Sequence, residues 1–199
     1  MSDWPEIYVL RHGQTEWNTE GRHQGRLDSG LTQLGRSQAT AQGRILRAAG
    51  LADCDIDIVA SPQGRAWTTA EIVLAEIGKT ARSDDRLVEI KFGDWQGLRF
   101  SEIEAGWPEM NHHKNDWEWH FTAPGGESFD ALAARARAFL NSLTGPAVVV
   151  THGITSKAIR GLWLGLDRAG MGALPGGQGI VYHLENGGQI CLEEATSPV

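Results

Sequence analysis

Two histidines in this sequence lie where phosphoryl chemistry could be carried out. Arg11-His12-Gly13 follows the apolar residues 7–10, and Thr151-His152-Gly153 follows the apolar residues 147–150. A short β-branched run that ends in a polar, glycine-containing turn is typical of a buried parallel strand. Open α/β sheets bind ligands at the carboxyl ends of their strands, so both histidines are expected at one edge.

The residue types of Arg11-His12-Gly13 suit a phosphate ester. A neutral imidazole is a good nucleophile toward phosphorus. Arg11 can neutralise phosphate oxygens, and its charge disfavours an imidazolium at His12. Gly13 permits close approach of the backbone. Three residues alone do not establish a phosphate site. A histidine at a strand end more often has a structural role, as a hydrogen-bond partner of a carbonyl group.

Alternating strands and helices are needed to position these residues. We predict strands or extended segments at residues 6–10, 56–60, 86–90 and 147–151. Helices are predicted at residues 31–50 with Thr32 as N-cap, 61–78 with Ser61 as N-cap, 101–106, 128–143 with Ser128 as N-cap, and 154–166. A hairpin at 179–194 turns at Asn186-Gly187-Gly188. This order predicts a three-layer α/β/α sandwich with a mostly parallel sheet.

Composition narrows the class of protein. The 199 residues suffice for one domain, which we expect to span 1–199. A net charge of −7 argues against general binding to nucleic acid or anionic membranes. The two cysteines, Cys54 and Cys191, are too few for a disulfide framework. Neither a signal peptide nor an apolar span of about 18 residues is found, so we expect a cytoplasmic protein.

A longer signature extends the first motif. Residues 11–18, Arg-His-Gly-Gln-Thr-Glu-Trp-Asn, resemble the signature of the histidine phosphatase superfamily, which includes cofactor-dependent phosphoglycerate mutase. Further matching pieces follow in order along nearly the whole chain: Gln24-Gly25, Leu31-Thr32 with Gly35, residues 61–66 with 68–70, residues 89–93 with Trp95 and Gly97, residues 124–128 and Thr151-His152-Gly153. Six such pieces in the right order are far more specific than any one of them.

The resemblance implies a role for each matching residue. His12 corresponds to the phosphorylated nucleophile, and Glu89 to the proton donor. Arg11, Arg65 and His152 correspond to groups that bind the transferring phosphoryl group. No metal or organic cofactor is implied, because His12 supplies the nucleophile and the arginines supply the positive charge.

Four further positions resemble contacts of the family with phosphate or substrate: Asn18, Gln24, Gly25 and Gly153. The two glycines could offer backbone N–H groups, although Asn and Gln in loops are often ordinary turn residues. Around Glu89 the sequence is apolar, which favours a sheltered carboxyl group, whereas nearby arginines favour the carboxylate. We predict an activity optimum on the acid side of neutrality.

Departures from the mutase pattern favour a phosphatase. Mutases carry Asn after the second His-Gly, where this chain has Ile154, and their Glu-Arg-His-Tyr segment is Glu89-Ile90-Lys91-Phe92 here. The long basic insertion of the mutases is also missing. We therefore expect hydrolysis of a small phosphomonoester through a phosphohistidine. Mutase-type phosphoryl transfer is the alternative, and an inactive phosphate-binding or scaffold protein is a further one.

The segment at about 98–124 is expected to be a lid-like insertion over the site. It contains His112, His113 and Lys114 among several tryptophans. The spacing of its histidines fits no standard zinc site, so an irregular lid with aromatic packing is preferred. A second interpretation is that His112, His113, Lys114 and Lys91 contact the leaving group. The exposed edge strand near the C-terminus suggests a homodimer.

Overall fold

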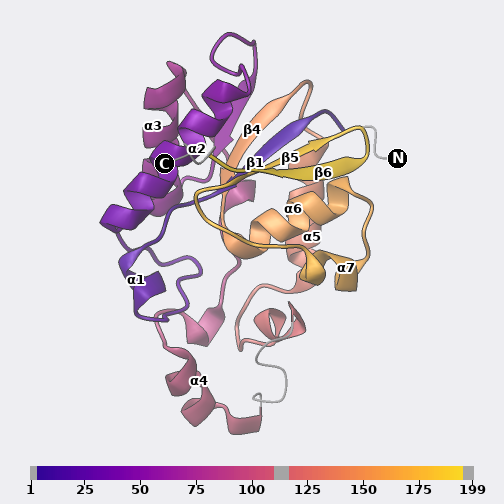
Figure 1. The fold of residues 1–199 in the computed structure, drawn as a ribbon. Coiled ribbons are helices and arrows are strands. Elements are labelled where there is room, and N and C mark those ends of the chain that lie inside the picture. The colour runs from indigo at the N-terminus through magenta and orange to yellow at the C-terminus, as the bar shows by residue number, and fades with distance from the viewer. Residues whose placement is uncertain (1–3, 110–116, 195–199) are drawn as a thin grey trace.

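The computed structural model describes residues 4–109 and 117–194. In this part of the chain the central sheet has six strands in the order β3-β2-β4-β1-β5-β6 (Figure 1). Parallel strands form one side of it: β1 (Ile7–Arg11), β2 (Asp57–Ala60), β3 (Arg82–Ser83) and β4 (Ala147–Thr151). Two antiparallel strands complete it: β5 (Val181–Glu185) and β6 (Gly188–Leu192).

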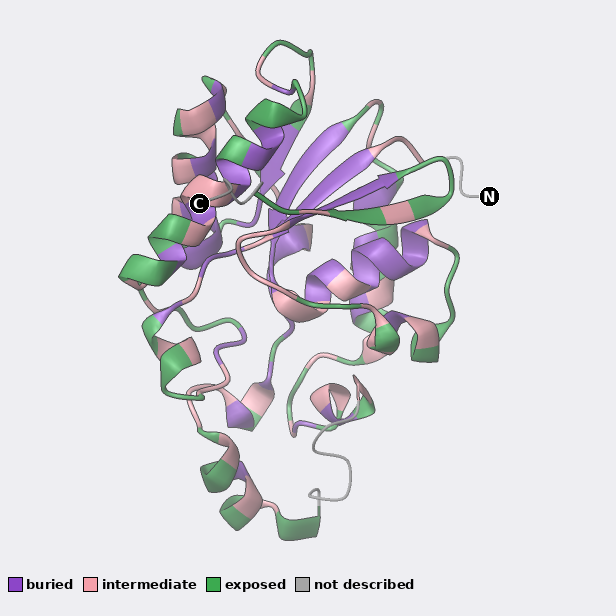
Figure 2. Ribbon diagram, in the orientation of Figure 1, coloured by how far each residue is buried: buried purple, intermediate pink, exposed green. Residues whose placement is uncertain are grey.

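Helices cover both faces of this sheet (Figure 1). One face carries α2 (Gln33–Ala48) and α3 (Gly64–Ile77), and the other carries α5 (Phe129–Leu140) and α6 (Gly153–Trp163). Successive strand side chains point to opposite faces, so Val149 and Val150 belong to different hydrophobic clusters. Figure 2 shows the inner strands β1 and β4 and the inward helix faces as mostly buried, whereas β6 is mostly exposed. The predicted three-layer sandwich with a mostly parallel sheet is confirmed.

Local signals set most element boundaries as expected. The hydroxyl groups of Thr32 and Ser128 accept hydrogen bonds from the first turns of α2 and α5. Gly78 closes α3 in the left-handed conformation. The hairpin of β5 and β6 turns at Asn186 and Gly187, which both have positive φ, as a tight two-residue turn requires.

Several expected elements are wrong. The expected strand or extended segment at 86–90 is wrong for its first two residues, because the Asp84 carboxylate accepts a bond from the Arg86 N–H and starts the 3₁₀ turn η1 (Asp85–Leu87). Val88 that follows is extended but belongs to no strand. Ser61 is not the N-cap of α3, because the helix begins at Gly64 and Gln63 is the N-cap. The Ser61 hydroxyl accepts from the Gln63 N–H at 3.3 Å, too early in the chain to cap the helix, and lies 2.8 Å from His152 Nε2. The short helices α1 (Glu16–Thr19) and α7 (Arg168–Ala173) were not predicted.

The segment that follows residue 98 lies beyond the carboxyl ends of the parallel strands (Figure 1). It contains α4 (Phe100–Gly106) and the 3₁₀ helix η4 (Trp117–Phe121). Trp119 is buried there and stacks on Trp95 with ring centroids 4.5 Å apart. Aromatic packing is therefore present, whereas His112, His113 and Lys114 lie outside the described residues. Within the described ranges no helix is long and apolar enough to cross a membrane.

Gly35 allows the loop after β1 to pass directly over the first turn of α2. A Cβ atom at Gly35 would overlap the carbonyl oxygen of Gln14, and one at Gly13 would overlap the Gly35 carbonyl. Neither backbone segment can move without displacing the turn that carries His12.

We expect Gly35→Ala to lower the free energy of unfolding by about 1–3 kcal/mol, as overpacking does. This loss outweighs the gain of about 1 kcal/mol in helix propensity. Gly30→Ala is the matched control, because a Cβ there meets nothing within 4 Å, and it should change stability by less than about 0.5 kcal/mol. Urea denaturation measures both variants, and equal effects would contradict the prediction.

Candidate active site

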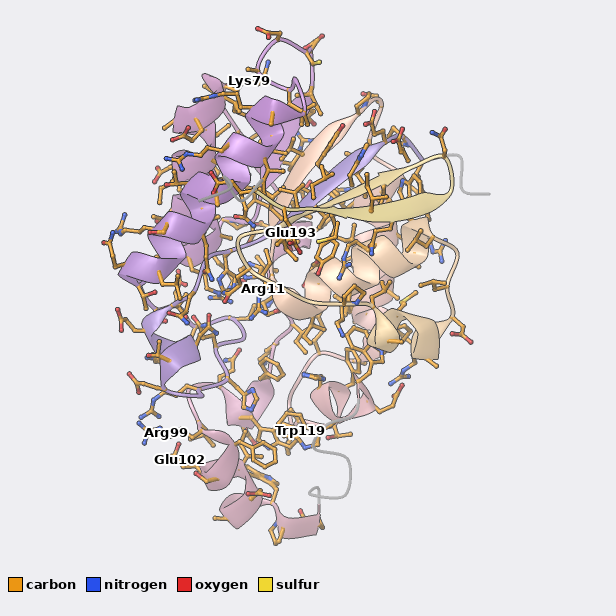
Figure 3. All side chains as sticks on the ribbon, in the orientation of Figure 1. Arg11, Lys79, Arg99, Glu102, Trp119 and Glu193 are labelled. Carbon is orange, nitrogen blue, oxygen red and sulfur yellow. The ribbon has the colours of Figure 1, made fainter. Side chains whose placement is uncertain are left out.

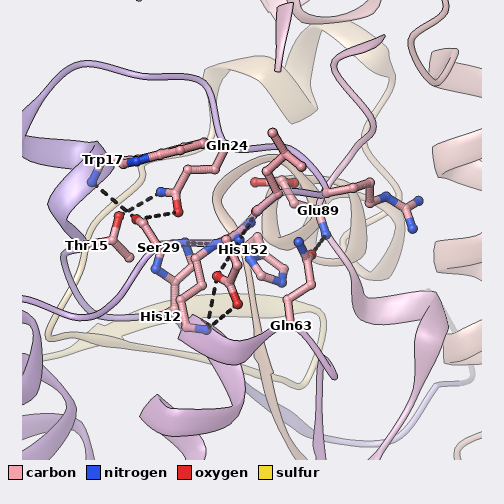
Figure 4. A network of polar contacts seen from close by, with 12 residues as sticks. His12, Thr15, Trp17, Gln24, Ser29, Gln63, Glu89 and His152 are labelled. Carbon is pink, nitrogen blue, oxygen red and sulfur yellow. Dashed lines mark hydrogen bonds and ion pairs between the residues drawn. The ribbon is translucent and has the colours of Figure 1, made fainter. Parts of the chain in front are cut away.

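The register of β1 and β4 brings the two histidine motifs together. Arg11 pairs with Thr151, and the His12 N–H continues the ladder to the Thr151 carbonyl oxygen at 3.0 Å. The rings of His12 and His152 follow directly, with centroids 5.2 Å apart. Both rings are buried. Figure 4 shows them with Gln63 and Glu89, and Figure 3 places Arg11 where the loops after the strands meet.

His12 is held as a neutral imidazole with one lone pair directed into the site. Its Nδ1 lies 2.8 Å from the Gly13 carbonyl oxygen, which can only accept, so Nδ1 carries the proton. Arg65 Nε donates to His12 Nε2 at 3.3 Å, so Nε2 carries the lone pair. Burial, and then the charges of Arg11 and Arg65, hold the pKa of His12 well below its usual 6.5.

Arg65 comes from the first turn of α3 and is almost fully buried. Its Nη1 donates to the Asp28 carboxylate at 2.9 Å and to the Leu27 carbonyl oxygen at 2.7 Å. Nη2 donates to the Gly25 carbonyl oxygen at 2.9 Å. Burial lowers the pKa of Arg65, whereas the carboxylates of Asp28 and Glu89 oppose this shift. These contacts fix the guanidinium plane with Nε against His12.

Glu89 lies against the N-terminus of α6. Its Oε1 accepts hydrogen bonds from the backbone N–H groups of Ile90 and Thr155 and from the Thr155 hydroxyl, each at 3.1 Å. Its Oε2 accepts one bond, from the Ile154 N–H at 3.1 Å. A carboxylate oxygen can accept about two bonds. Oε2 is therefore the oxygen with remaining capacity to exchange a proton.

His152 is the N-cap residue of α6 and is fully buried. Its Nε2 lies 2.8 Å from the Ser61 hydroxyl, and its Nδ1 has no partner within the described part of the chain. Burial, followed by the charges of Arg65, His12 and Arg11, holds its pKa well below 6.5. A neutral His152 can offer Nδ1–H to a ligand when Ser61 donates its hydroxyl proton to Nε2.

A single cavity of about 310 Å³ collects these residues. All nine predicted positions except His152, which is fully buried, line this cavity: Arg11, His12, Asn18, Gln24, Gly25, Arg65, Glu89 and Gly153. Lys91 is exposed and is not one of the described residues that line the cavity. The prediction that Lys91 contacts the leaving group is therefore not supported by its position.

Three of the second-rank residues are already engaged within the protein. Asn18 Oδ1 accepts from the Thr15 N–H at 3.1 Å, and Gln24 Nε2 donates to the Thr15 hydroxyl at 2.8 Å. Gly25 contributes its carbonyl oxygen to Arg65, and the role of its N–H group toward a ligand stays a prediction. Gly153 is not engaged in this way, because no hydrogen bond of its N–H is found among the described residues. It also lies close to Arg11, since a Cβ atom at Gly153 would lie 3.4 Å from Arg11 Cζ.

The sequence reasoning missed several residues that position the site. Gln63 accepts from the Glu89 N–H at 2.6 Å and donates to the Gly25 carbonyl oxygen at 2.8 Å. Gln178 donates to the His12 carbonyl oxygen at 3.0 Å from a loop before β5. Asp28 holds Arg65. All three lie outside regular helices and strands, where periodicity carries no signal.

Comparison with known proteins assigns the family. A family model described as "Histidine phosphatase superfamily (branch 1)" matches residues 7–191. The chain belongs to the histidine phosphatase superfamily. The resemblance seen in the sequence is therefore confirmed as family membership. The arrangement of His12, Arg65, Glu89 and His152 described above is that of a histidine phosphatase superfamily protein.

Curated relatives in the family differ in length and name. A bifunctional protein of Mycobacterium tuberculosis is 34% identical over 184 residues, which cover 89% of this chain and 46% of that protein. The chain therefore spans about half the length of the first relatives it matches. The glucosyl-3-phosphoglycerate phosphatase of the same species is 37% identical over 185 residues, covering 85% of this chain and 80% of the relative.

Solved structures of the family superpose along most of the chain. The mycobacterial glucosyl-3-phosphoglycerate phosphatase in complex with VO3 has a TM-score of 0.77 and 34% identity, with 91% of each chain covered. Bacillus stearothermophilus YhfR has a TM-score of 0.78 and 31% identity, covering 97% of this chain and 98% of that one.

A group of possible metal ligands lies away from this cavity. Among the described residues, Glu6, His183 and Glu185 place one ligand atom each within 4.8 Å of one another. Glu6 Oε1 already accepts from the Tyr8 hydroxyl at 2.7 Å and lies 2.6 Å from His183 Nε2. These contacts account for the cluster as a polar network at the opposite end of β1 from His12.

His23, at the cavity rim, gives a pH prediction for stability. Burial and the neighbouring His120 lower the pKa of His23 from 6.5 to about 4. Below pH 6.5 the unfolded chain therefore binds a proton that the folded chain does not, and stability falls as pH falls toward 4.

We expect His23→Phe to reduce the loss of unfolding free energy between pH 7 and pH 5 by about 1–2 kcal/mol. The wild type remains pH-dependent through other groups, so the difference between the two proteins is the readout. Chemical denaturation at several pH values measures it, and parallel curves for both proteins would refute the assignment.

Proposed function

We propose that this chain is a phosphomonoesterase that hydrolyses a small phosphorylated metabolite through a phosphohistidine at His12. The observation that carries the proposal is the neutral Nε2 of His12, held by Arg65 in the same cavity as Arg11 and Glu89. Family membership and the phosphatase names of several relatives support it.

In the first step His12 Nε2 attacks phosphorus, and the bond from phosphorus to the ester oxygen breaks. Glu89, protonated at Oε2, gives its proton to the leaving oxygen. In the second step Glu89 takes a proton from water, which attacks the phosphohistidine and releases inorganic phosphate. The free imidazole and the protonated Glu89 are restored, so the cycle balances.

Positive charge and oriented donors stabilise the transferring group. Arg65 Nε leaves His12 Nε2 and bonds a phosphoryl oxygen as phosphorus approaches. Arg11 Nε and His152 Nδ1 are buried without partners among the described residues, and they supply further donors together with the Gly153 N–H. Preorganised donors of this kind account for most of the catalysis in phosphoryl transfer.

Water is the proposed acceptor of the phosphoryl group. Ile154 lines the cavity with an apolar side chain, and its N–H is occupied by Glu89. It therefore offers no donor to a second phosphate group. No metal or organic cofactor is included in the proposal, because the arginines supply the positive charge.

Mutase activity is the second candidate, since relatives carry that name. The 2,3-bisphosphoglycerate-dependent phosphoglycerate mutase of Methylocella silvestris is 31% identical and covers 96% of this chain. With 3-phosphoglycerate and catalytic 2,3-bisphosphoglycerate, we expect release of inorganic phosphate without formation of 2-phosphoglycerate. Rapid formation of 2-phosphoglycerate would establish the mutase instead.

Other expectations stay predictions. They are a single domain over 1–199, a lid at about 98–124, a cytoplasmic location, an acid pH optimum and a homodimer. A small-molecule phosphomonoester is the proposed partner, and a net charge of −7 is unfavourable for nucleic acid or anionic membranes.

The proposed nucleophile can be tested directly. His12→Gln should lower kcat on an aryl phosphate by at least about 1,000-fold, because covalent catalysis is lost. Mass spectrometry of acid-sensitive phosphopeptides after rapid quenching should find phosphate on His12 in the wild type. His183→Gln is the matched control and should retain activity, since His183 contacts Glu6 away from the cavity. Phosphate on His152 would overturn the assignment.

A further inference from the structure

The cavity extends well beyond the groups that bind phosphate. Its rim is lined by residues from five separate segments: Arg22, His23, Phe92, His120, Ile154, Lys157 and Gly176. The phosphoryl group is taken up by His12 and its neighbours, so the leaving group must lie against this rim. The charges of the rim therefore select the leaving group.

The two permanent cations of the rim, Arg22 and Lys157, differ in how they are compensated. Arg22 forms an ion pair with Glu20 at 2.7 Å and a longer one with Glu102 at 3.6 Å. Lys157 has no carboxylate within 4.0 Å among the residues described. Its Nζ donates to the Gly172 carbonyl oxygen at 2.7 Å and lies 5.9 Å from the centre of the Trp117 ring.

Helix α6 directs Lys157 into the cavity. Ile154 and Lys157 are three residues apart and so share one helix face, the face that begins with Gly153 beside Arg11. An ammonium group has three N–H donors, and the Gly172 carbonyl uses one. Two donors remain on a half-buried cation, whose pKa is lowered by burial and by the charges of Arg160 and Arg11.

We propose that Lys157 binds a carboxylate carried by the leaving group of the substrate. The charge balance selects this group, because one uncompensated positive charge on the rim matches one negative charge. The inference rests on the proposed phosphomonoesterase function and adds a substrate class, a small phosphomonoester with a carboxylate.

Two phosphomonoesters that differ at one carbon test the proposal. In 3-phosphoglycerate a carboxylate replaces the terminal hydroxymethyl group of glycerol 3-phosphate. The wild type should prefer 3-phosphoglycerate. Lys157→Met should lower kcat/KM on 3-phosphoglycerate by about 10-fold or more, mainly through KM, as expected for loss of one charge-assisted bond. Its kcat/KM on glycerol 3-phosphate should stay within about 2-fold.

Two further variants sharpen the test. Lys157→Arg keeps the charge and should retain most of the preference for 3-phosphoglycerate. Lys79→Met is the matched control, because Lys79 also donates to a backbone carbonyl, that of Cys54 at 2.6 Å, and lies far from Arg11 in Figure 3. Lys79→Met should leave both substrates unaffected.

Equal loss on both substrates, or no loss on either, overturns the proposal. A stronger dependence on Lys157 for 1,3-propanediol bisphosphate would assign the position to a second phosphate and also overturn it. Calorimetric binding of 3-phosphoglycerate and glycerol 3-phosphate in the His12→Gln background tests Lys157 without turnover. If the wild type hydrolyses no phosphomonoester, the proposed function fails, while this binding comparison still decides the role of Lys157.

Discussion

The parallel pairing of β1 with β4 is the constraint on which the site depends. It sets Arg11 opposite Thr151 and so places two histidines, 140 positions apart in the sequence, with ring centroids 5.2 Å apart. The first turn of α6 then follows directly and supplies three donors to Glu89. A shift of one residue in this register would turn every side chain of β1 to the other face.

Buried charge sets the chemistry of the two histidines. The Asp28 carboxylate holds Arg65 beside His12, and the charge of Glu89 favours the protonated forms of both Arg11 and Arg65. Burial, and then the charges of Arg11 and Arg65, keep His12 neutral, and the same charges attract a phosphate dianion. A phosphorylated imidazole also remains close to the arginines that neutralise it. Nucleophile activation and substrate binding therefore depend on one set of groups rather than two.

The sequence predicts the strands better than the site. Residues 147–151 were predicted as a strand because a β-branched run between turn residues has few alternatives, and the Thr32 cap follows from local hydrogen bonding. Ser61 was misassigned because α3 begins at Gly64, so the Ser61 hydroxyl accepts the Gln63 N–H ahead of the helix and also contacts His152. The catalytic positions came from a family resemblance, since no local pattern gives Glu89 its place beside α6.

The hydrogen-bond donors around Glu89 could not be predicted from the sequence either, because they come from a segment far away in the chain. Its apolar neighbours Leu87 and Ile90 are buried as expected, yet the carboxylate itself contacts backbone amides of a helix 65 residues away. Gln63 and Gln178 are loop residues, and their hydrogen bonds to Glu89 and His12 form only because distant segments of the chain end beside them. Such contacts follow from topology, which composition and periodicity leave open.

The position of β1 in the sheet has a consequence for the order of folding. Both of its neighbours, β4 and β5, lie after residue 146, although β1 is the first strand made. During synthesis β1 therefore cannot pair with either neighbour until the chain beyond residue 147 has left the ribosome. Such nonlocal pairing slows folding and leaves an apolar strand exposed while the chain grows. The candidate site, in which Gln178 contacts His12, forms only after β4 and β5 have closed around β1. Activity therefore reports on finished folding and not on partly folded forms.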